Sequence, residues 1–200
     1  MATLHRSTVP AVEDVVYEPE VVRSSAARKA LAVLRLAFGF TFLWAFFDKL
    51  LALGFHTGWT TNPETGEETL SRFGDAAWIN GGSPTEGFLM YGTQGAWFHG
   101  FFSSFAGAAW ADWLFMIGLL GIGVALMLGI GMRIAAASGA LLYLMMYLAV
   151  LPLENNPVVD DHLIGAVAVI VLALTLSGDT WGAGKAWAKT HLVREYPVLR

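Results

Sequence analysis

Long, mainly apolar segments are separated by more polar ones along this chain. Four of the apolar segments have the length and composition of membrane spans, at residues 30–55, 113–131, 134–151 and 158–177. A helix needs about 20 predominantly apolar residues to cross a hydrocarbon core about 30 Å thick. We therefore predict an all-α fold, an integral membrane four-helix bundle over residues 29–182. A long extracytoplasmic loop at 56–112 would connect the first two spans.

The uncharged segment from Gly87 to Ala111 allows more than one interpretation. It could form a fifth span, but its glycines and aromatic residues favour an interfacial or re-entrant segment, which could act as a lid on the outer face. Upstream of it, residues 62–66 have the composition of a turn, which would belong either to a short hairpin or to a surface loop. In the second span, Gly118, Gly121 and Gly123 would let neighbouring helices approach closely.

Composition supports a membrane environment and excludes several functions. Charged residues make up 14% of the chain, whereas soluble domains contain about a quarter. The net charge is -4 and no basic run occurs, so we expect no nucleic-acid partner. Cysteine is absent, so the chain cannot carry out dithiol chemistry or hold an iron–sulfur cluster with its own thiolates. Any redox function would need a group from elsewhere.

The positions of the cations predict the orientation. Residues 1–28 lack the apolar core of a secretory signal, so we predict a disordered cytoplasmic tail there. Cytoplasmic loops retain Lys and Arg, and in a four-span chain nearly all loop cations fall on one side, with Arg72 alone opposite. Both termini, including a C-terminal tail at 183–200, are therefore predicted to be cytoplasmic, in a multi-pass protein of the cell membrane. The cations on the cytoplasmic side are Arg6, Arg23, Arg28, Lys29, Arg133, Lys185, Lys189, Arg194 and Arg200.

Charged residues at membrane depth mark candidate sites, because a charge in the hydrocarbon core costs a few kcal/mol or more. In the first span, Arg35 would either extend to the cytoplasmic headgroups or face the bundle. Asp48 and Lys49 lie toward the outer end of that span. Asp160, Asp161 and His162 lie at the outer start of the fourth span, and Lys49 would pair with one of these aspartates.

Aromatic residues lie near these charges. Trp44 shares a face with Asp48, and Tyr143 and Tyr147 are one turn apart on the third span. Together with the charged residues they predict a polar, aromatic pocket in the outer leaflet. The alternative is that the charges are ordinary helix-end residues at the headgroup level and the aromatic residues an interfacial belt, which is the interpretation we favour for Trp59, Trp78 and Trp181.

Histidines raise the question of a metal site. His56, His99 and His162 all fall on the outer side, but their spacing matches no short ligand motif, and we predict no metal site. His162 beside two carboxylates suits proton exchange better, because an ordinary imidazole has a pKa of about 6.5.

Several short motifs occur along the chain in a recognisable order and spacing. They are LRL at 34–36, FLW at 42–44, DKL at 48–50, WINGGSPTEGFL at 78–89, GIGVAL at 121–126, Gly129, Arg133, DHL at 161–163 and TWG at 180–182. Together they resemble the DoxX/DoxD family of small membrane proteins, over about residues 28–187. The family implies a four-helix membrane bundle, and its DoxD branch includes the membrane subunit of thiosulfate:quinone oxidoreductase, which the outer loop at 81–85 most resembles. By position, the resemblance implies that the polar residues of the bundle are Arg35, Asp48, Lys49, Asp161 and His162.

This resemblance leads to a functional hypothesis: a subunit that passes electrons from a small sulfur compound or partner protein to membrane quinone. Lys49 would stabilise negative charge or bind an anion such as thiosulfate. Membrane lipid and a second oxidoreductase subunit are the expected partners, and a homo-oligomer is compatible with the sequence. The alternative is a non-catalytic membrane anchor or assembly subunit. The candidate catalytic residues are Asp161, His162, Asp48, Lys49 and Arg35, and the candidate quinone-binding residues are Trp44, Tyr143, Tyr147 and Asp160.

Overall fold

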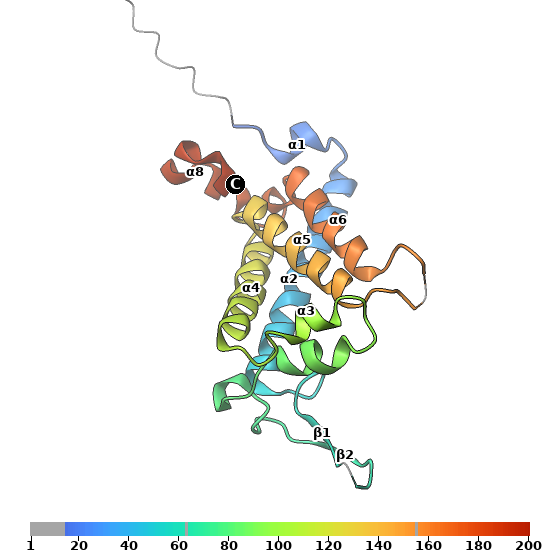
Figure 1. The fold of residues 1–200 in the computed structure, drawn as a ribbon. Helices are drawn as coiled ribbons and strands as arrows, with labels where there is room; N and C mark the ends of the chain where they lie inside the picture. The colour runs from blue at the N-terminus through green and yellow to red at the C-terminus, as the bar shows by residue number, and fades with distance from the viewer. Residues whose placement is uncertain (1–14, 63, 155) are drawn as a thin grey trace, which may run out of the picture.

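Helices dominate the fold. The structure is a computed structural model that describes residues 15–62, 64–154 and 156–200. The four longest helices are α2 (Ser25–Leu51), α4 (Ala109–Leu128), α5 (Met132–Ala149) and α6 (Asp161–Leu174), and they pack side by side (Figure 1). The first three are long and apolar enough to cross a membrane, whereas α6 has 14 residues and is shorter than the expected span at 158–177.

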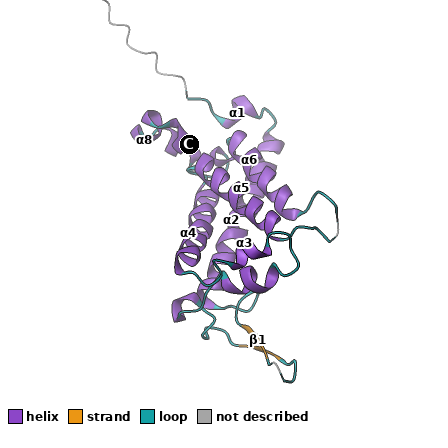
Figure 2. Ribbon diagram, viewed as in Figure 1, coloured by secondary structure: helices purple, strands orange, loops and turns teal. Residues whose placement is uncertain are grey.

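The two ends of this helical assembly differ. One end carries α1 (Glu18–Val21) and the C-terminus, and we call it the α1 end (Figure 1). The opposite end carries the strands β1 (Trp59–Thr61) and β2 (Glu68–Leu70), and we call it the hairpin end (Figure 2). Large apolar side chains are exposed along the flanks of the helices, which is the distribution expected where lipid replaces water as solvent. They include Phe40, Leu114, Leu141 and Val167.

Small residues bring α2 and α4 into close contact. A Cβ atom added at Gly123 would lie 2.8 Å from the side chain of Leu43, and one added at Gly39 would lie 3.0 Å from Met127. Gly118 and Gly121 have nothing within 4 Å of such an atom. Of the three glycines predicted to admit a neighbouring helix, only Gly123 does so. The main core beside this contact contains Phe42, Phe46, Met116, Leu119, Ile122 and Leu126.

The β-hairpin confirms one of the two alternatives for the turn at 62–66, and it adds a small two-stranded sheet to a mostly helical fold. Strands β1 and β2 pair antiparallel as a two-stranded sheet. The Asn62 side chain starts the turn, because its Oδ1 accepts a hydrogen bond from the Glu64 amide at 2.9 Å. Pro63, which belonged to the predicted turn, lies outside the described residues.

The uncharged segment from Gly87 to Ala111 forms no helix of spanning length. It contains η2 (Phe88–Gly92) and α3 (His99–Ser103), both short, and α4 begins at Ala109. Leu89 and Phe102 pack against Ala149 at the end of α5. The structure thus agrees with the interpretation that this segment is not a fifth span.

The α1 end is more structured than the sequence suggested. Residues 1–14 of the predicted disordered tail lie outside the described residues, but residues 15–28 include α1 and the start of α2, which Ser24 caps through the Ala27 amide. The segment that follows α6 and the C-terminal tail fold into short helices over this end. They are η3 (Ser177–Asp179), α7 (Gly184–Ala188), α8 (His191–Glu195) and η4 (Pro197–Leu199). The remaining short element, η1 (Trp78–Asn80), lies in the loop at the hairpin end.

Candidate functional site

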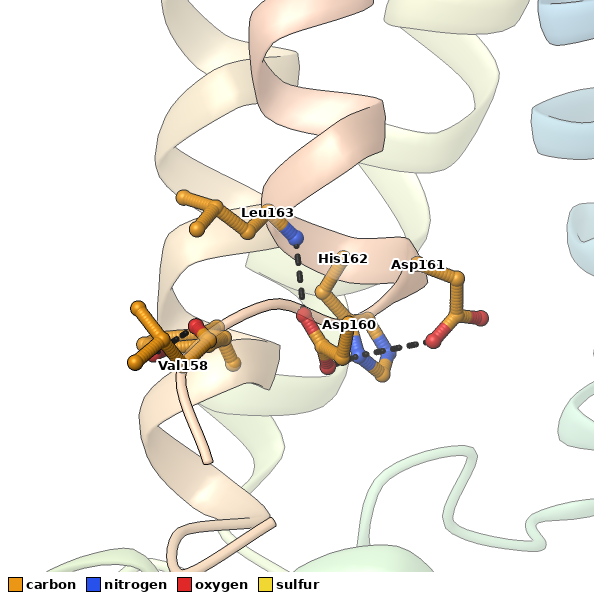
Figure 3. Close-up of polar contacts among 6 residues, drawn as sticks. Val158, Asp160, Asp161, His162 and Leu163 are labelled. Atoms are coloured by element: carbon orange, nitrogen blue, oxygen red, sulfur yellow. Dashed lines mark hydrogen bonds and ion pairs between the residues drawn. The ribbon is translucent and has the colours of Figure 1, made fainter. Parts of the chain in front are cut away.

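Asp160 has two functions in the local structure (Figure 3). It is the N-cap residue of α6, and its Oδ1 accepts a hydrogen bond from the Leu163 amide at 2.9 Å. Its other oxygen, Oδ2, lies 2.6 Å from Nδ1 of His162. Because both oxygens are engaged, the carboxylate holds the imidazole in a defined orientation relative to the first turn of the helix.

The hydrogen bond from His162 to Asp160 determines which ring nitrogen is free for chemistry. When the carboxylate accepts a hydrogen bond from Nδ1, the proton of the neutral ring resides on Nδ1 and the lone pair on Nε2. Nε2 makes no hydrogen bond with the described residues. The His162 side chain is 18% exposed, so Nε2 is an oriented atom that can accept or return a proton.

Asp161 is placed differently from Asp160. Its side chain is 94% exposed and its nearest carboxylate oxygen lies 3.7 Å from Nδ1 of His162. The ligand atoms of Asp160, Asp161 and His162 all lie within 4.8 Å of one another, which is the only grouping of this kind among the described residues. A metal bound through Nδ1 of His162 would have to displace the hydrogen bond to Asp160, whereas proton exchange at Nε2 leaves that bond intact.

Tyr143, on α5, forms an aromatic wall beside His162. The centroids of the two rings are 6.4 Å apart, and the tyrosine ring also meets Phe42 edge-on at 5.4 Å. Gly165 makes room for this ring, since a Cβ atom added there would lie 2.9 Å from it. Gly165 was missed in the sequence analysis, although its position three residues after His162 places both on one helix face.

Tyr147 positions the segment that precedes α6. Its hydroxyl donates a hydrogen bond to the carbonyl oxygen of Val158 at 2.7 Å. This bond connects α5 with the residues that lead to the Asp160 cap. Tyr147, predicted to bind quinone, therefore supports the site through the backbone.

The charged residues at the end of α2 do not join this site. The buried carboxylate of Asp48 accepts hydrogen bonds from the amides of Phe55 and His56, each at 3.0 Å, and so closes the turn after α2. The Nζ atom of Lys49 lies 5.9 Å from the centre of the Phe115 ring. No ion pair within the described part of the chain joins Lys49 to an aspartate of α6, so the predicted pair is wrong.

Trp44 also lies apart from His162. Its ring stacks on Phe40 at 5.8 Å and meets Phe55 edge-on at 4.9 Å. Both partners are exposed on the flank of α2 or in the loop that follows it. The predicted pocket therefore divides into a group around His162 and Tyr143 and a separate group at the end of α2.

Arg35 lies at the α1 end of the fold. It is 13 residues before Asp48 on α2, which is about 20 Å at about 1.5 Å per residue. The side chain is completely buried, so it faces the interior of the helical assembly, as the second of the two sequence-based alternatives expected. Its guanidinium donates to five backbone carbonyl groups, those of Leu126, Met127, Ser177, Thr180 and Trp181. These bonds satisfy carbonyls at the end of α4 and in the segment after α6.

The other histidines are not part of a shared site. His99 Nδ1 lies 2.7 Å from the hydroxyl of the buried Thr93, within the uncharged segment. Neither His56 nor His99 belongs to the metal-ligand grouping that includes His162.

Two hollows in the described part of the structure lie away from His162. One borders the β-hairpin and is lined by Thr60, Thr61, Asn62, Glu64 and Thr69. The other lies at the α1 end and includes Asp179 and Arg200. The side chains of Tyr143 on α5 and His162 on α6 line neither hollow and are partly exposed.

Comparisons with known proteins do not assign the chain to a family. No family model matches the chain, and no curated protein or solved structure matches it.

Proposed function

We propose that the chain is a DoxX/DoxD-like membrane subunit that passes electrons from a small sulfur compound or partner protein to membrane quinone. The observation that supports this most directly is the Asp160–His162 pair beside the ring of Tyr143. Quinone sites need an apolar, aromatic surface that can be reached from lipid and groups that exchange protons near the carbonyl oxygens. Tyr143 offers the surface and His162 the proton-exchanging atom.

The proposed function requires a membrane placement, which we propose as four spans formed by α2, α4, α5 and α6. Helix α6 is about 21 Å long at about 1.5 Å per residue, so local bilayer thinning or tilt would accommodate it. Its N-terminus, with Asp160 and His162, would then lie at the edge of the hydrocarbon core, where a quinone ring arrives from lipid. The distribution of Lys and Arg supports a cell-membrane protein with both termini in the cytoplasm.

The residues of the site divide the chemistry among them. A bound quinone would accept electrons and protons in equal number and become the quinol. His162 would donate a proton from Nε2, and the carboxylate of Asp160 would stabilise the charged imidazole that precedes this transfer. The chain has no cysteine, so the electrons would come from an external donor or a second subunit.

Quinone binding to the purified chain in nanodiscs tests this proposal. We expect saturable binding to the native protein and affinity at least about tenfold weaker, which is about 1.4 kcal/mol, in His162→Ala. His99→Ala is the matched control, because His99 bonds to Thr93 in a different part of the fold. Absence of binding, or equal losses in both variants, would contradict the proposal.

An anchor or assembly subunit is the second candidate, and one observation favours it. The uncharged segment 87–111 exposes large aromatic side chains at its surface, an arrangement also found where proteins dock. They include Tyr91, Trp97, Phe101 and Trp110, each more than 60% exposed. Under this function, His162→Ala would leave quinone affinity unchanged, and Trp97→Ser would release a co-purifying partner.

A further inference from the structure

The segment that includes α1 is held at the α1 end by a buried carboxylic acid. Glu18 is completely buried although α1 comprises one turn of helix. The Thr180 hydroxyl donates a hydrogen bond to Glu18 Oε2, and the Glu18 amide donates to Oδ2 of Asp179 at 3.0 Å. Asp179 ends η3 and Thr180 follows it, so residues separated by 161 and 162 positions in the chain join α1 to the end of the helical assembly.

One oxygen of Glu18 lacks a partner. Oε1 is buried and makes no hydrogen bond within the described residues. A buried carboxylate oxygen without a hydrogen-bond donor costs free energy, because the charged group loses its hydration and no protein hydrogen bond replaces it. Protonation removes that charge and leaves Oε2 free to accept the hydrogen bond from Thr180.

The charged groups around Glu18 have opposing effects on the ionisation of its carboxyl group. Asp179 on η3 opposes a second negative charge, whereas Arg28 on α2 and Lys185 on α7 favour it. Arg35 also lies within electrostatic range of Glu18, but its guanidinium is committed to backbone carbonyls. Arg200 engages Asp179 at 3.3 Å.

Burial is the largest influence on Glu18 and raises its pKa above the ordinary 4.5. The negative charge of Asp179 also raises this pKa, whereas the hydrogen bond from Thr180 and the positive charges of Arg28 and Lys185 lower it. The net effect is a raised pKa. The docked segment therefore binds the proton more tightly than a released segment does.

We propose that Glu18 makes residues 17–22 a proton-operated latch, which is docked on Asp179 and Thr180 when the carboxyl is protonated and released when the proton leaves. By linkage, the stabilisation of the docked state is complete below the ordinary pKa and is lost as the pH rises through the raised value. Release would uncover Thr180, whose carbonyl is one of the five that hold Arg35. The latch would thus make the packing of the α1 end sensitive to the pH on that side of the protein.

Distance measurements between two spin labels test the latch in the full chain reconstituted in nanodiscs. The chain has no cysteine, so cysteines at the exposed positions Val16 and Lys189 give two specific labels. We expect a narrow distance distribution at about pH 4, where the docked state has its full stabilisation, and a lower ratio of docked to released populations at about pH 8.

Two variants separate the role of the Glu18 proton from general loss of structure. Glu18→Gln mimics the protonated acid, so the distribution should stay narrow at both pH values. Glu20→Gln removes an exposed carboxylate from the same helix and should retain the native pH response. A native distribution that is unchanged between the two pH values, or release of Glu18→Gln at low pH, would overturn the latch.

Hydrogen exchange of the unsubstituted chain gives a second measurement that does not depend on variant folding. After correction for the intrinsic pH dependence of exchange, the Glu18 and Val22 amides should lose protection as the pH rises, because both are hydrogen-bonded in the docked segment. Constant protection would contradict the proposal.

Discussion

The carboxylate of Asp160 caps α6 with one oxygen and holds Nδ1 of His162 at 2.6 Å with the other. The side chain that starts the helix therefore also orients the imidazole. This relationship explains why adjacent aspartates are not equivalent. The side chain of Asp161, one residue later, is almost fully exposed and makes no hydrogen bond to the backbone of the described residues.

Asp160→Asn should separate the two functions of this residue. Asparagine caps helices about as well as aspartate, so we expect the free energy of unfolding to change by less than about 1 kcal/mol. The amide lacks the negative charge that stabilises the charged imidazole, so quinone affinity should fall at least about tenfold. Binding in nanodiscs measures the affinity, and Asp161→Asn is the control that should change it less than about twofold. Equal effects of the two variants would show that Asp160 has no special role.

Replacement of Arg35 should destabilise the fold strongly. Arg35→Met removes the donors for five backbone carbonyls inside the structure, and we expect a loss of about 3 kcal/mol or more. Arg133→Met is the matched control, because Arg133 is exposed and donates from its side chain to a single carbonyl, that of Pro197. Reversible unfolding in detergent measures both. A small change in Arg35→Met would mean that water replaces the guanidinium.

A methyl group at Gly165 should disturb the aromatic wall of the candidate site. The added Cβ atom would meet the Tyr143 ring at 2.9 Å, and overpacking of this kind costs about 1–3 kcal/mol. Gly118→Ala adds the same group to α4, where nothing lies within 4 Å. That control should be neutral or stabilising by up to about 1 kcal/mol, because alanine favours a helix. Thermal unfolding of the two variants distinguishes them, and equal stability would show that the Tyr143 ring moves aside freely.

Side-specific cysteine labelling tests the proposed four-span placement. With cysteines at Gly66 in the hairpin turn and at Lys189 near the C-terminus, a membrane-impermeant reagent should label the two positions from opposite sides of the membrane. With an even number of spans, both termini lie on the same side of the membrane, and the loop after α2 lies on the opposite side. Gly66 and Asp75 lie in the same loop and should label from one side. Labelling of Gly66 and Lys189 from the same side would rule out the placement.

Local patterns in the sequence were sufficient to predict the long helices, a possible hairpin and one group of polar residues. The long apolar segments predicted the positions of three helices that are long enough to span a membrane and of a shorter fourth helix. This prediction is possible because a helix of this kind is encoded in a continuous run of apolar residues. The same reasoning found the hairpin alternative at residues 62–66. It also grouped Asp160, Asp161 and His162, because they are consecutive in the chain. Their assignment to quinone chemistry stays a prediction.

Only the tertiary structure decided which polar groups serve the candidate site and which serve the fold. Arg35 and Asp48 looked like catalytic residues because charge is costly in lipid, but backbone carbonyls and amides satisfy them, and backbone partners have no signature in sequence. The burial of Glu18 depends on Thr180, 162 residues away. Such contacts arise where α1 and the segment after α6 meet at one end of the helical assembly, whereas sequence patterns report only on neighbours within a few turns.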